Sequence, residues 1–507
     1  MDANTAFTLV LGLPLVASPI VYLVGRLWAR QNGSSSNANP ARWLAILALL
    51  AAGVFTYFAG VGATATYTGI TLTFGDLSLT MDGLGLFLTV TVLALGLMAT
   101  LYSTKYMEAT VGEEKFYALL VAMIGAIIGL GCATDVFNMW LWFELMAVTS
   151  YFLVAFYRDQ KASLEAGIKY LVQSATGSTL VMLGLALTFA ATGTMRFDLL
   201  RQAAQSANPL LLAAGALFVI GFGVKSALVP LHTWLPDAHS QAPSGISAML
   251  SGIVIEAGLV AMLRSLSCLY ATSTSHIWGI LLLVFGALNL LVGNLMALRQ
   301  TEVKRLLAYS SVSQVGYMLL GFGMAFTYGA ADGAVGGFFH LFNHALMKGL
   351  AFLAAGALLY ALYIANDRHG ALTLNDLNGA SRRYPVTAFC LSLAVLALGG
   401  LPPLAGFMSK WQIFASGFET GNTVAIALVI FAALNSVLSL GYYAPMVNRL
   451  YRNEPSQTVL EGKPISAWMA APMILLALAI VVIGVWPSLL TELTSRAALS
   501  LFLLMGG

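Results

Sequence analysis

Apolar stretches long enough to cross a membrane recur along almost the whole chain, separated by short polar segments. They lie at approximately 5–25, 43–62, 83–102, 116–134, 136–156, 166–192, 209–229, 245–270, 277–298, 306–327, 334–363, 386–415, 423–447 and 467–490. A helix needs about 20 residues to cross the hydrocarbon core. The pattern therefore predicts an all-α polytopic membrane protein with about fourteen transmembrane helices. We expect the first stretch to be a transmembrane helix rather than a cleaved signal peptide, because no basic leader precedes it.

The polar segments are too short to form a large soluble domain. The longest are residues 31–42, 63–82 and 364–385. Within 70–82, apolar and polar side chains alternate around a central Gly75-Asp76 pair. This alternation predicts a short β-hairpin, which we expect on the outer face.

Composition agrees with a membrane protein and excludes several kinds of site. Apolar residues make up 59% of the chain and charged residues 9%, outside the range of soluble domains. The net charge of +3 is spread over loops, so we expect no nucleic-acid partner. Cys132, Cys268 and Cys390 stand alone, and no P-loop or dinucleotide motif follows a strand. We therefore predict no metal and no bound cofactor, and we expect any redox chemistry to lie in partner subunits.

Lysine and arginine are concentrated in every second loop, as expected when the loops on the inner side carry the positive charge. The outer side keeps Arg196, Arg201 and Arg496. With the N-terminus outside, the inner loops and helix ends carry Arg26, Arg30, Arg42, Lys105, Lys115, Arg158, Lys161, Lys169, Arg299, Lys304, Arg305, Arg368, Arg382, Arg383, Arg449, Arg452 and Lys463. An even number of crossings then predicts that the C-terminus is outside too.

Glu144 and Lys225 are the first candidates for chemistry inside the membrane, where a charged side chain costs about 3 kcal/mol. Glu144 lies deep in the fifth stretch, and Lys225 precedes Pro230, which we expect to break its helix about one turn further on. Burial favours the neutral amine and a nearby carboxylate favours the ammonium, so the pair could load and release a proton. The alternative is a static buried ion pair that fixes two helices.

His340, His344 and Lys348 stand at i, i+4 and i+8 on one long apolar stretch. Each step of four rises about 6 Å and drifts only about 40° around a helix, so the three groups form a row that water could bridge into a proton wire. A packing role is the alternative for histidines in a membrane helix. Metal binding is disfavoured, because the adjacent ammonium would repel the ion.

Lys410 follows a second break, formed by Pro402 and Pro403 between several glycines. Two interrupted helices in separate halves of a chain are typical of transporters built from inverted repeats. The alternative is that the prolines only kink packed helices.

Four strings in the sequence resemble a known family. They are PLHTWLPDAHSQAPSGISAMLSG (230–252), LRQTEVKRLLAYSSVSQVGYMLLG (298–321), HLFNHALMKGLAFLAAGAL (340–358) and GLPPLAGFMSKWQIF (400–414). They are similar to the antiporter-like proton-pumping subunits of respiratory complex I, of membrane-bound hydrogenases and of Mrp antiporters. The resemblance runs from about residue 80 to 450. It implies two inverted five-helix repeats, over helices 4–8 and 9–13, with helices 7 and 12 broken.

The resemblance also implies a division of the chain. We expect helices 1–3 and the outer hairpin in residues 1–110, and the first repeat in 111–272. The second repeat is expected in 273–450, and a C-terminal helix and tail in 451–507.

The resemblance assigns proton-carrying roles residue by residue. Glu256 departs from the pattern, because the family usually has a connecting lysine at this point of its eighth helix. A carboxylate there could still relay protons, although it reverses the local charge. The other residues that match the family's motifs are Glu144, Lys225, His232, His340, His344, Lys348 and Lys410.

These matches favour a proton-translocating membrane-arm subunit of a complex I-like (NADH or ferredoxin:quinone oxidoreductase) or hydrogenase-like complex. Its expected partners are other membrane subunits, the lipid bilayer and peripheral redox subunits with flavin or iron–sulfur clusters, in a bacterial or archaeal cytoplasmic membrane. Lys410 is unlike the glutamate of the usual middle pump, and residues 491–507 are too few for the long lateral helix of the largest pump. The alternatives are a subunit of an Mrp-type Na⁺/H⁺ antiporter and a structural subunit whose channel does not conduct.

Overall fold

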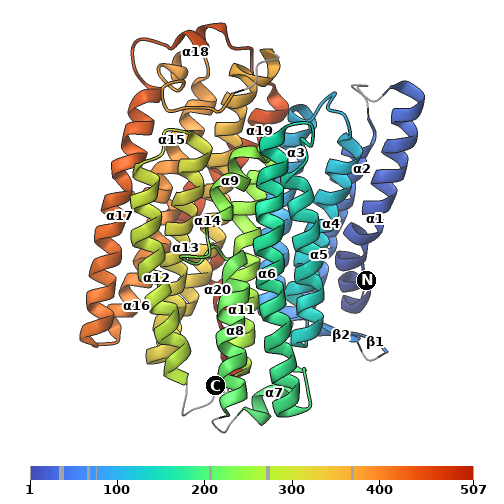
Figure 1. Ribbon diagram of the computed structural model, residues 1–507, viewed down its shortest axis with the longest axis vertical. Helices are drawn as coiled ribbons and strands as arrows, with labels where there is room; N and C mark the ends of the chain where they lie inside the picture. The colour runs from blue at the N-terminus through green and yellow to red at the C-terminus, as the bar shows by residue number, and fades with distance from the viewer. Residues whose placement is uncertain are drawn as a thin grey trace.

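A bundle of long, roughly parallel helices makes up most of the molecule (Figure 1). The computed structural model describes residues 2–33, 39–65, 69–75, 77–204, 208–269, 275–366 and 370–505. Asp76 of the predicted hairpin turn and Arg368 of the predicted inner loops lie outside these residues.

The helices follow the predicted apolar stretches closely. In the first half they are α1 (Ala3–Asn32), α2 (Ala41–Ala65), α3 (Gly83–Tyr106), α4 (Glu113–Cys132), α5 (Val136–Val154), α6 (Lys161–Thr192), α7 (Phe197–Ala203), α8 (Pro209–Lys225), α9 (Trp234–Gln241), α10 (Ser244–Met249), the π-helical turn η1 (Leu250–Val254) and α11 (Ile255–Cys268). In the second half they are α12 (Ser275–Leu298), α13 (Val303–Tyr328), α14 (Ala331–Leu362), the 3₁₀ turns η2 (Ile364–Asn366) and η3 (Ala380–Arg382), α15 (Pro385–Gly399), α16 (Ala405–Glu419), α17 (Thr423–Leu450), α18 (Gln457–Glu461), α19 (Ala467–Val485) and α20 (Ser488–Met505).

The lengths and apolar character of these helices confirm an all-α polytopic membrane protein. In the described residues, 11 helices are long and apolar enough to cross a membrane, and α8 and α15 are shorter apolar helices. Both of these are the first halves of predicted broken helices, since α8 stops before α9 and α15 stops before α16. The prediction of two interrupted helices is therefore confirmed.

The predicted hairpin is also present. Strands β1 (Ile70–Phe74) and β2 (Leu77–Met81) pair antiparallel, with Ile70 opposite Met81. Both of these side chains are buried, as are Leu72 and Leu79. The alternation that predicted the hairpin therefore separates a face that packs on the helices from an exposed one.

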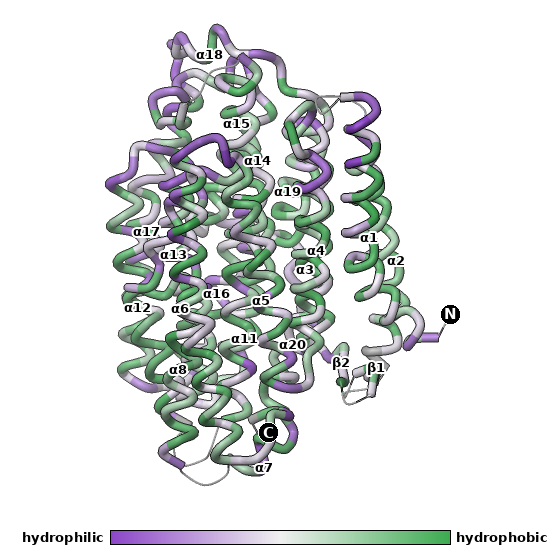
Figure 2. Tube along the Cα trace, turned by 45° about the vertical axis from the view of Figure 1, so that its right-hand side comes forward, coloured by the Kyte–Doolittle hydropathy of each residue, from purple (hydrophilic) through white to green (hydrophobic). Residues whose placement is uncertain are grey.

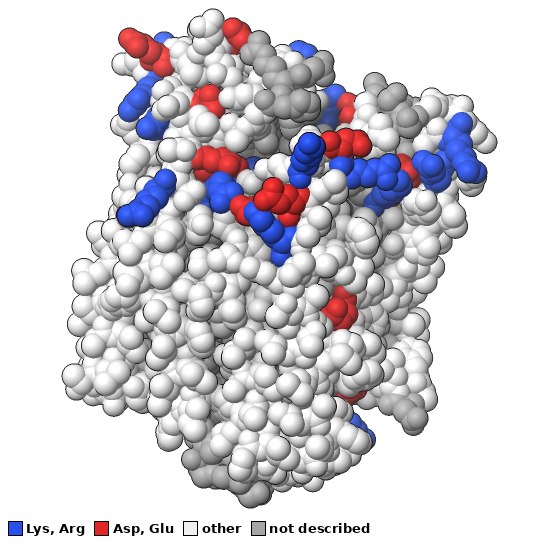
Figure 3. Space-filling view, viewed as in Figure 1, with Lys and Arg blue, Asp and Glu red and all other residues white. Residues whose placement is uncertain are grey.

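Charged side chains gather toward one end of the bundle. Hydrophobic residues dominate its middle in Figure 2, and Figure 3 shows most visible lysine, arginine, aspartate and glutamate near the end that carries α18. Arg42 and Glu113 form a buried ion pair of 2.8 Å at this end. Both termini lie in the opposite half (Figure 1).

The C-terminal part differs from the predicted single helix and tail. The helix expected over 467–490 stops at Val485, and a second helix, α20, begins just after Pro487. Proline favours the start of a helix over its interior, which accounts for the division. Ala497, Ala498 and Leu501 are buried, so one face of α20 packs on the bundle instead of forming a loose tail.

Candidate functional site

The first broken helix opens directly after Lys225, the last residue of α8, rather than a turn later as predicted. Asn289 of α12 forms hydrogen bonds with backbone groups that have no helical partner at this break. Its Oδ1 accepts from Val229 N at 2.8 Å, and its Nδ2 donates to Ala227 O at 3.1 Å. A non-helical backbone at membrane depth needs such partners, because lipid offers none.

Lys225 is buried at this break and has hydroxyl and aromatic neighbours. Its Nζ donates to Ser150 Oγ at 3.1 Å and also to the Tyr170 hydroxyl. It lies 4.4 Å from the centre of the Tyr170 ring, which stacks on Trp234 at 4.0 Å. A ring face stabilises an ammonium, whereas the hydroxyls can accept its hydrogen bonds whenever it is charged.

Glu144 does not touch Lys225. Its Oε1 is buried without a hydrogen-bond partner, and in the described part of the chain no salt bridge joins the two residues. The predicted pair is therefore not in contact.

The second broken helix places Lys410 beside the freed end of α15. Lys410 Nζ donates to Leu398 O at 2.8 Å and to Ser436 Oγ at 2.9 Å. It also lies 4.3 Å from the centre of the Tyr317 ring. Carbonyls at the C-terminal end of a helix attract a cation, so the break itself helps to hold the charge of Lys410.

A cavity of about 230 Å³ lies next to Lys410. Gly400, Phe407, Trp411 and Ser436 line it with the lysine. Trp411 is 59% exposed, so the cavity borders the lateral surface of the bundle. Lys410 is thus separated from this surface only by the residues that line the cavity.

Between the breaks, His340 and His344 lie on α14 as predicted, with ring centres 6.3 Å apart. His340 Nδ1 lies 2.9 Å from Ser409 Oγ, and its Nε2 lies 3.0 Å from Gln314 Oε1. Gln314 in turn donates to Leu398 O, the carbonyl that also accepts from Lys410. His340 is therefore linked to Lys410 through shared hydrogen-bond partners.

His344 meets Glu256, at the position where the resemblance predicts a connecting lysine. His344 Nδ1 lies 2.5 Å from Glu256 Oε1, and both side chains are fully buried. Their other polar atoms, His344 Nε2 and Glu256 Oε2, have no partner among the described protein atoms. The π-helical turn η1 ends just before α11, which begins at Ile255, and such turns are frequent at functional sites.

Lys348 completes the row on α14. Its Nζ donates to Leu307 O at 2.7 Å and to Ser310 Oγ, both on α13. Like the two histidines, Lys348 is fully buried. The row predicted from the spacing of these three residues is therefore present as one buried stripe, with partners from α11, α13 and α16.

His232 is not brought to the row. It is buried in the first break, its Nδ1 has no partner among the described residues, and its ring lies 6.2 Å from that of Tyr309. Its role in proton transfer stays a prediction.

Sequence reasoning missed the polar side chains that join these groups. Asn289 and Gln314 hold the breaks, and Tyr170, Tyr317 and Ser436 surround the two lysines. The sequence does mark such residues, because each is a polar side chain within an apolar helix. Examples are ALNLL around Asn289 and VSQVG around Gln314.

The fold and site define a polytopic membrane protein with a buried series of ionisable side chains between two interrupted helices. Residues 133–436 match the family described as "NADH:quinone oxidoreductase/Mrp antiporter, TM". The chain belongs to this family, whose members include the antiporter-like membrane subunits.

Relatives that match nearly the full length of the chain support this family assignment. F(420)H(2) dehydrogenase subunit N of Methanosarcina mazei is 33% identical, with 96% of this chain and 97% of the relative covered. NADH-quinone oxidoreductase subunit N of Desulfitobacterium hafniense is 32% identical, with 97% and 96% covered. The fold is similar to a chain of the membrane-bound sulfane sulfur reductase, an archaeal respiratory membrane complex, with a TM-score of 0.85, 28% identity and 98% of each chain covered.

Proposed function

We propose that this chain translocates protons across the membrane as a subunit of a redox-driven respiratory complex. The observation that carries the proposal is the buried contact between Glu256 and His344, inside the row that leads to Lys348 on one side and His340 on the other. A carboxylate and an imidazole in contact can hold one proton between them and pass it on. The relatives named above, which are dehydrogenase and oxidoreductase subunits, support the redox coupling.

In this mechanism, redox energy released in partner subunits perturbs the electrostatic coupling between Glu144 and Lys225. Lys225 then gives up its proton toward Lys348 and the two histidines, and Lys410 delivers it to the outer side. Moving one charge against 100 mV requires about 2.3 kcal/mol. At an effective dielectric constant of 20, two unit charges about 8 Å apart interact by about 2 kcal/mol, so a change in the coupling of two separated charges is of the same size.

The proposed complex contains two further kinds of subunit. Other membrane subunits continue the membrane arm, and peripheral subunits with flavin or iron–sulfur clusters carry the electrons. The concentration of charge at the α18 end (Figure 3) supports an orientation with this end inside and both termini outside. The membrane is the cytoplasmic membrane of a bacterium or archaeon.

Replacing either broken-helix lysine tests the proposal. In Lys225→Ala and Lys410→Ala, proton pumping should be abolished while the subunits still co-purify, because each change removes a buried proton carrier. Lys161→Ala, at an exposed position, is the control. The measurement is acidification of inside-out vesicles per electron transferred, and normal pumping by both variants in assembled complexes would refute the assignment.

Two alternatives give different results. A subunit of an Mrp-type antiporter, which the family also contains, would show sodium-dependent pH changes in vesicles without an electron donor. A structural subunit with a non-conducting channel would leave the pumping stoichiometry unchanged after Lys348→Ala. Tagging the chain and recording the visible spectrum of the subunits that co-purify would distinguish an Mrp-type antiporter from a redox complex. Flavin or iron–sulfur absorbance would indicate the redox complex.

A further inference from the structure

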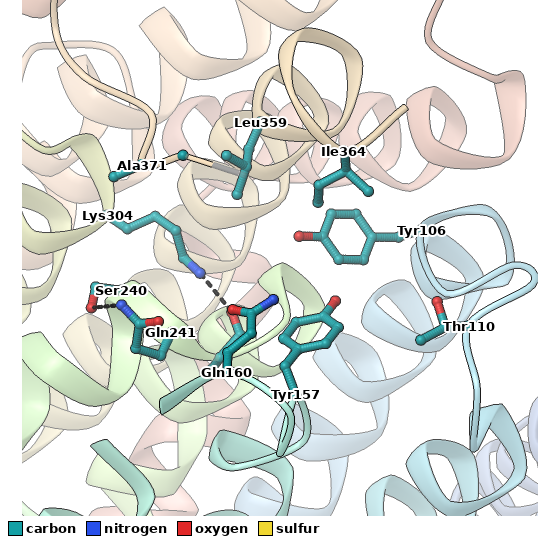
Figure 4. Close-up of a pocket in the computed structure, with 12 residues that line it drawn as sticks. Tyr106, Thr110, Tyr157, Gln160, Ser240, Gln241, Lys304, Leu359, Ile364 and Ala371 are labelled. Atoms are coloured by element: carbon teal, nitrogen blue, oxygen red, sulfur yellow. Dashed lines mark hydrogen bonds between the residues drawn. The ribbon is translucent and has the colours of Figure 1, made fainter. Parts of the chain in front are cut away.

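A cavity of about 480 Å³ opens near the charged end of the bundle. Its walls come from both halves of the chain: the end of α3, the segment between α5 and α6 and the end of α9 on one side, and α13, α14 and the segment after α14 on the other. Figure 4 shows Lys304 facing Tyr106 and Tyr157 across it. Pockets that hold small ligands usually have volumes of about 300–1,000 Å³, so this cavity is large enough for one.

Lys304 gives the cavity its charge, and within the part of the chain that the structure describes no acidic side chain lines it. Its Nζ donates to Ala242 O at 2.6 Å, and only 3% of the residue is exposed. Glu302 lies two residues earlier, but among the described residues no salt bridge joins it to Lys304. Burying an ammonium beside a single carbonyl is costly, because its other protons need acceptors too. An anion in the cavity would supply them.

Neutral hydrogen-bonding groups accompany Lys304 around the cavity. The amide of Gln160 and the hydroxyl of Thr110 line it, and neither makes a side-chain hydrogen bond to another described residue. The Gln241 amide and the Ser240 hydroxyl, joined at 3.1 Å, lie on the wall that α9 forms. Hard metal ions prefer carboxylate and carbonyl oxygens, and the ammonium would repel them. The lining therefore fits an anion.

A phosphate monoester fits these donors better than a carboxylate does. Its three terminal oxygens can accept from an ammonium, an amide and a hydroxyl at the same time, whereas a carboxylate has only two oxygens. Tyr106, Tyr157, Leu359 and Ile364 give the cavity a partly apolar wall. The organic part of a phosphate ester would lie against this wall.

We propose that the cavity binds a phosphate monoester, with the phosphate against Lys304 and Gln160 and the organic part against the two tyrosines. The same group can come from a compound dissolved at the charged end or from the headgroup of a phosphatidate lipid. Because the walls belong to both halves of the chain, the bound ligand holds these halves together and stabilises the folded protein. The inference goes beyond the proposed function, since it assigns a binding site that the buried row on α14 does not use.

Binding of ³²P-labelled inorganic phosphate to the purified complex tests the site. In Lys304→Gln, the half-saturating phosphate concentration should rise at least tenfold, because a charged hydrogen-bond donor is lost. Lys161→Gln is the matched control, because Lys161 is exposed and lies outside the described lining of the cavity. Its half-saturating concentration should stay within twofold of that of the unmodified complex.

A change at an exposed position keeps the test decisive if Lys304→Gln does not assemble. Gln160 is exposed, so Gln160→Glu should fold. Its carboxylate should repel the phosphate and raise the half-saturating concentration at least tenfold. Gln202→Glu makes the same substitution at an exposed position on α7 and should leave phosphate binding unchanged.

Native mass spectrometry of the same complexes distinguishes the two sources of the phosphate. If the ligand is a phosphatidate, the unmodified complex should retain one more phosphatidate after purification than the Gln160→Glu complex. If the ligand is a dissolved phosphate ester, the two complexes should retain equal numbers, while their binding of labelled phosphate still differs.

Equal phosphate binding and equal phosphatidate retention in the unmodified, Lys304→Gln and Gln160→Glu complexes would overturn the proposed site. The proposed function is tested separately, because Lys410 lines a different cavity. Lys410→Ala should stop proton pumping and leave phosphate binding unchanged. If Lys410→Ala pumps normally, the proposed function fails whatever the binding result.

Discussion

Glu256 stands where the family resemblance predicts a lysine, and it meets His344 at 2.5 Å. A lysine in this place would set an ammonium against the imidazole, so that the proton would have to leave one cationic group for another. The carboxylate instead accepts a hydrogen bond from the ring. We therefore expect Glu256 to connect α11 to the row of His340, His344 and Lys348, whereas an ammonium there would interrupt the row.

Replacing Glu256 should show this dependence. In Glu256→Gln, a hydrogen bond to His344 can persist but the group can no longer ionise, so we expect proton pumping to fall at least tenfold in assembled complexes. Glu256→Lys should be equally impaired, because it places a second cation beside the row that ends in Lys348. Vesicle acidification per electron measures both, and normal pumping by Glu256→Lys would show that the carboxylate is dispensable.

At the scale of elements, both interrupted helices depend on amide side chains from other helices. Asn289 of α12 serves the α8–α9 break, and Gln314 of α13 serves the α15–α16 break. Asn289 orders the backbone that follows Lys225, and Gln314 shares the Leu398 carbonyl with Lys410. The breaks are thus held in one geometry by hydrogen bonds and are not merely points of bending.

Removing Asn289 should destabilise the protein. Asn289→Ala leaves Val229 N and the carbonyls of Ala227 and Val312 without this partner, and at about 1–3 kcal/mol for each unsatisfied buried group we expect a loss of roughly 2–4 kcal/mol after relaxation. Thermal unfolding in detergent measures it. Asn32→Ala, at an exposed position, is the control, and equal midpoints for the two variants would contradict the role of Asn289.

At the scale of the whole molecule, most charged side chains visible in Figure 3 lie in the half opposite to the two termini, which Figure 1 marks. A membrane protein with its positive loops inside would place the α18 end in the cytoplasm. The hairpin of β1 and β2 would then lie on the outer face, as the sequence predicts.

Cysteine labelling tests this orientation. Arg452→Cys, at an exposed position between α17 and α18, should react with an impermeant thiol reagent only from the inner side. Phe74→Cys, in the exposed part of β1, should react only from the outer side. Labelling of intact cells and of inside-out vesicles distinguishes the two, and the reverse pattern would invert the proposed direction of pumping.

The sequence by itself determined the features that depend on local periodicity and backbone chemistry. Apolar length gave the helices, and prolines near Lys225 and Lys410 gave the two breaks. The four-residue spacing of His340, His344 and Lys348 gave their shared stripe on α14, because helix geometry fixes which side chains share a face.

Only the tertiary structure decided what these side chains meet. Lys225 touches Ser150 and Tyr170 rather than Glu144, and Glu256 meets His344 across 88 positions of sequence. The rotation and depth of one helix against another follow from side-chain packing between segments far apart in the chain, and no local pattern records them. For the same reason, the link from His340 through Gln314 to Leu398 O, which also accepts from Lys410, appears only when α13, α14 and α15 pack together.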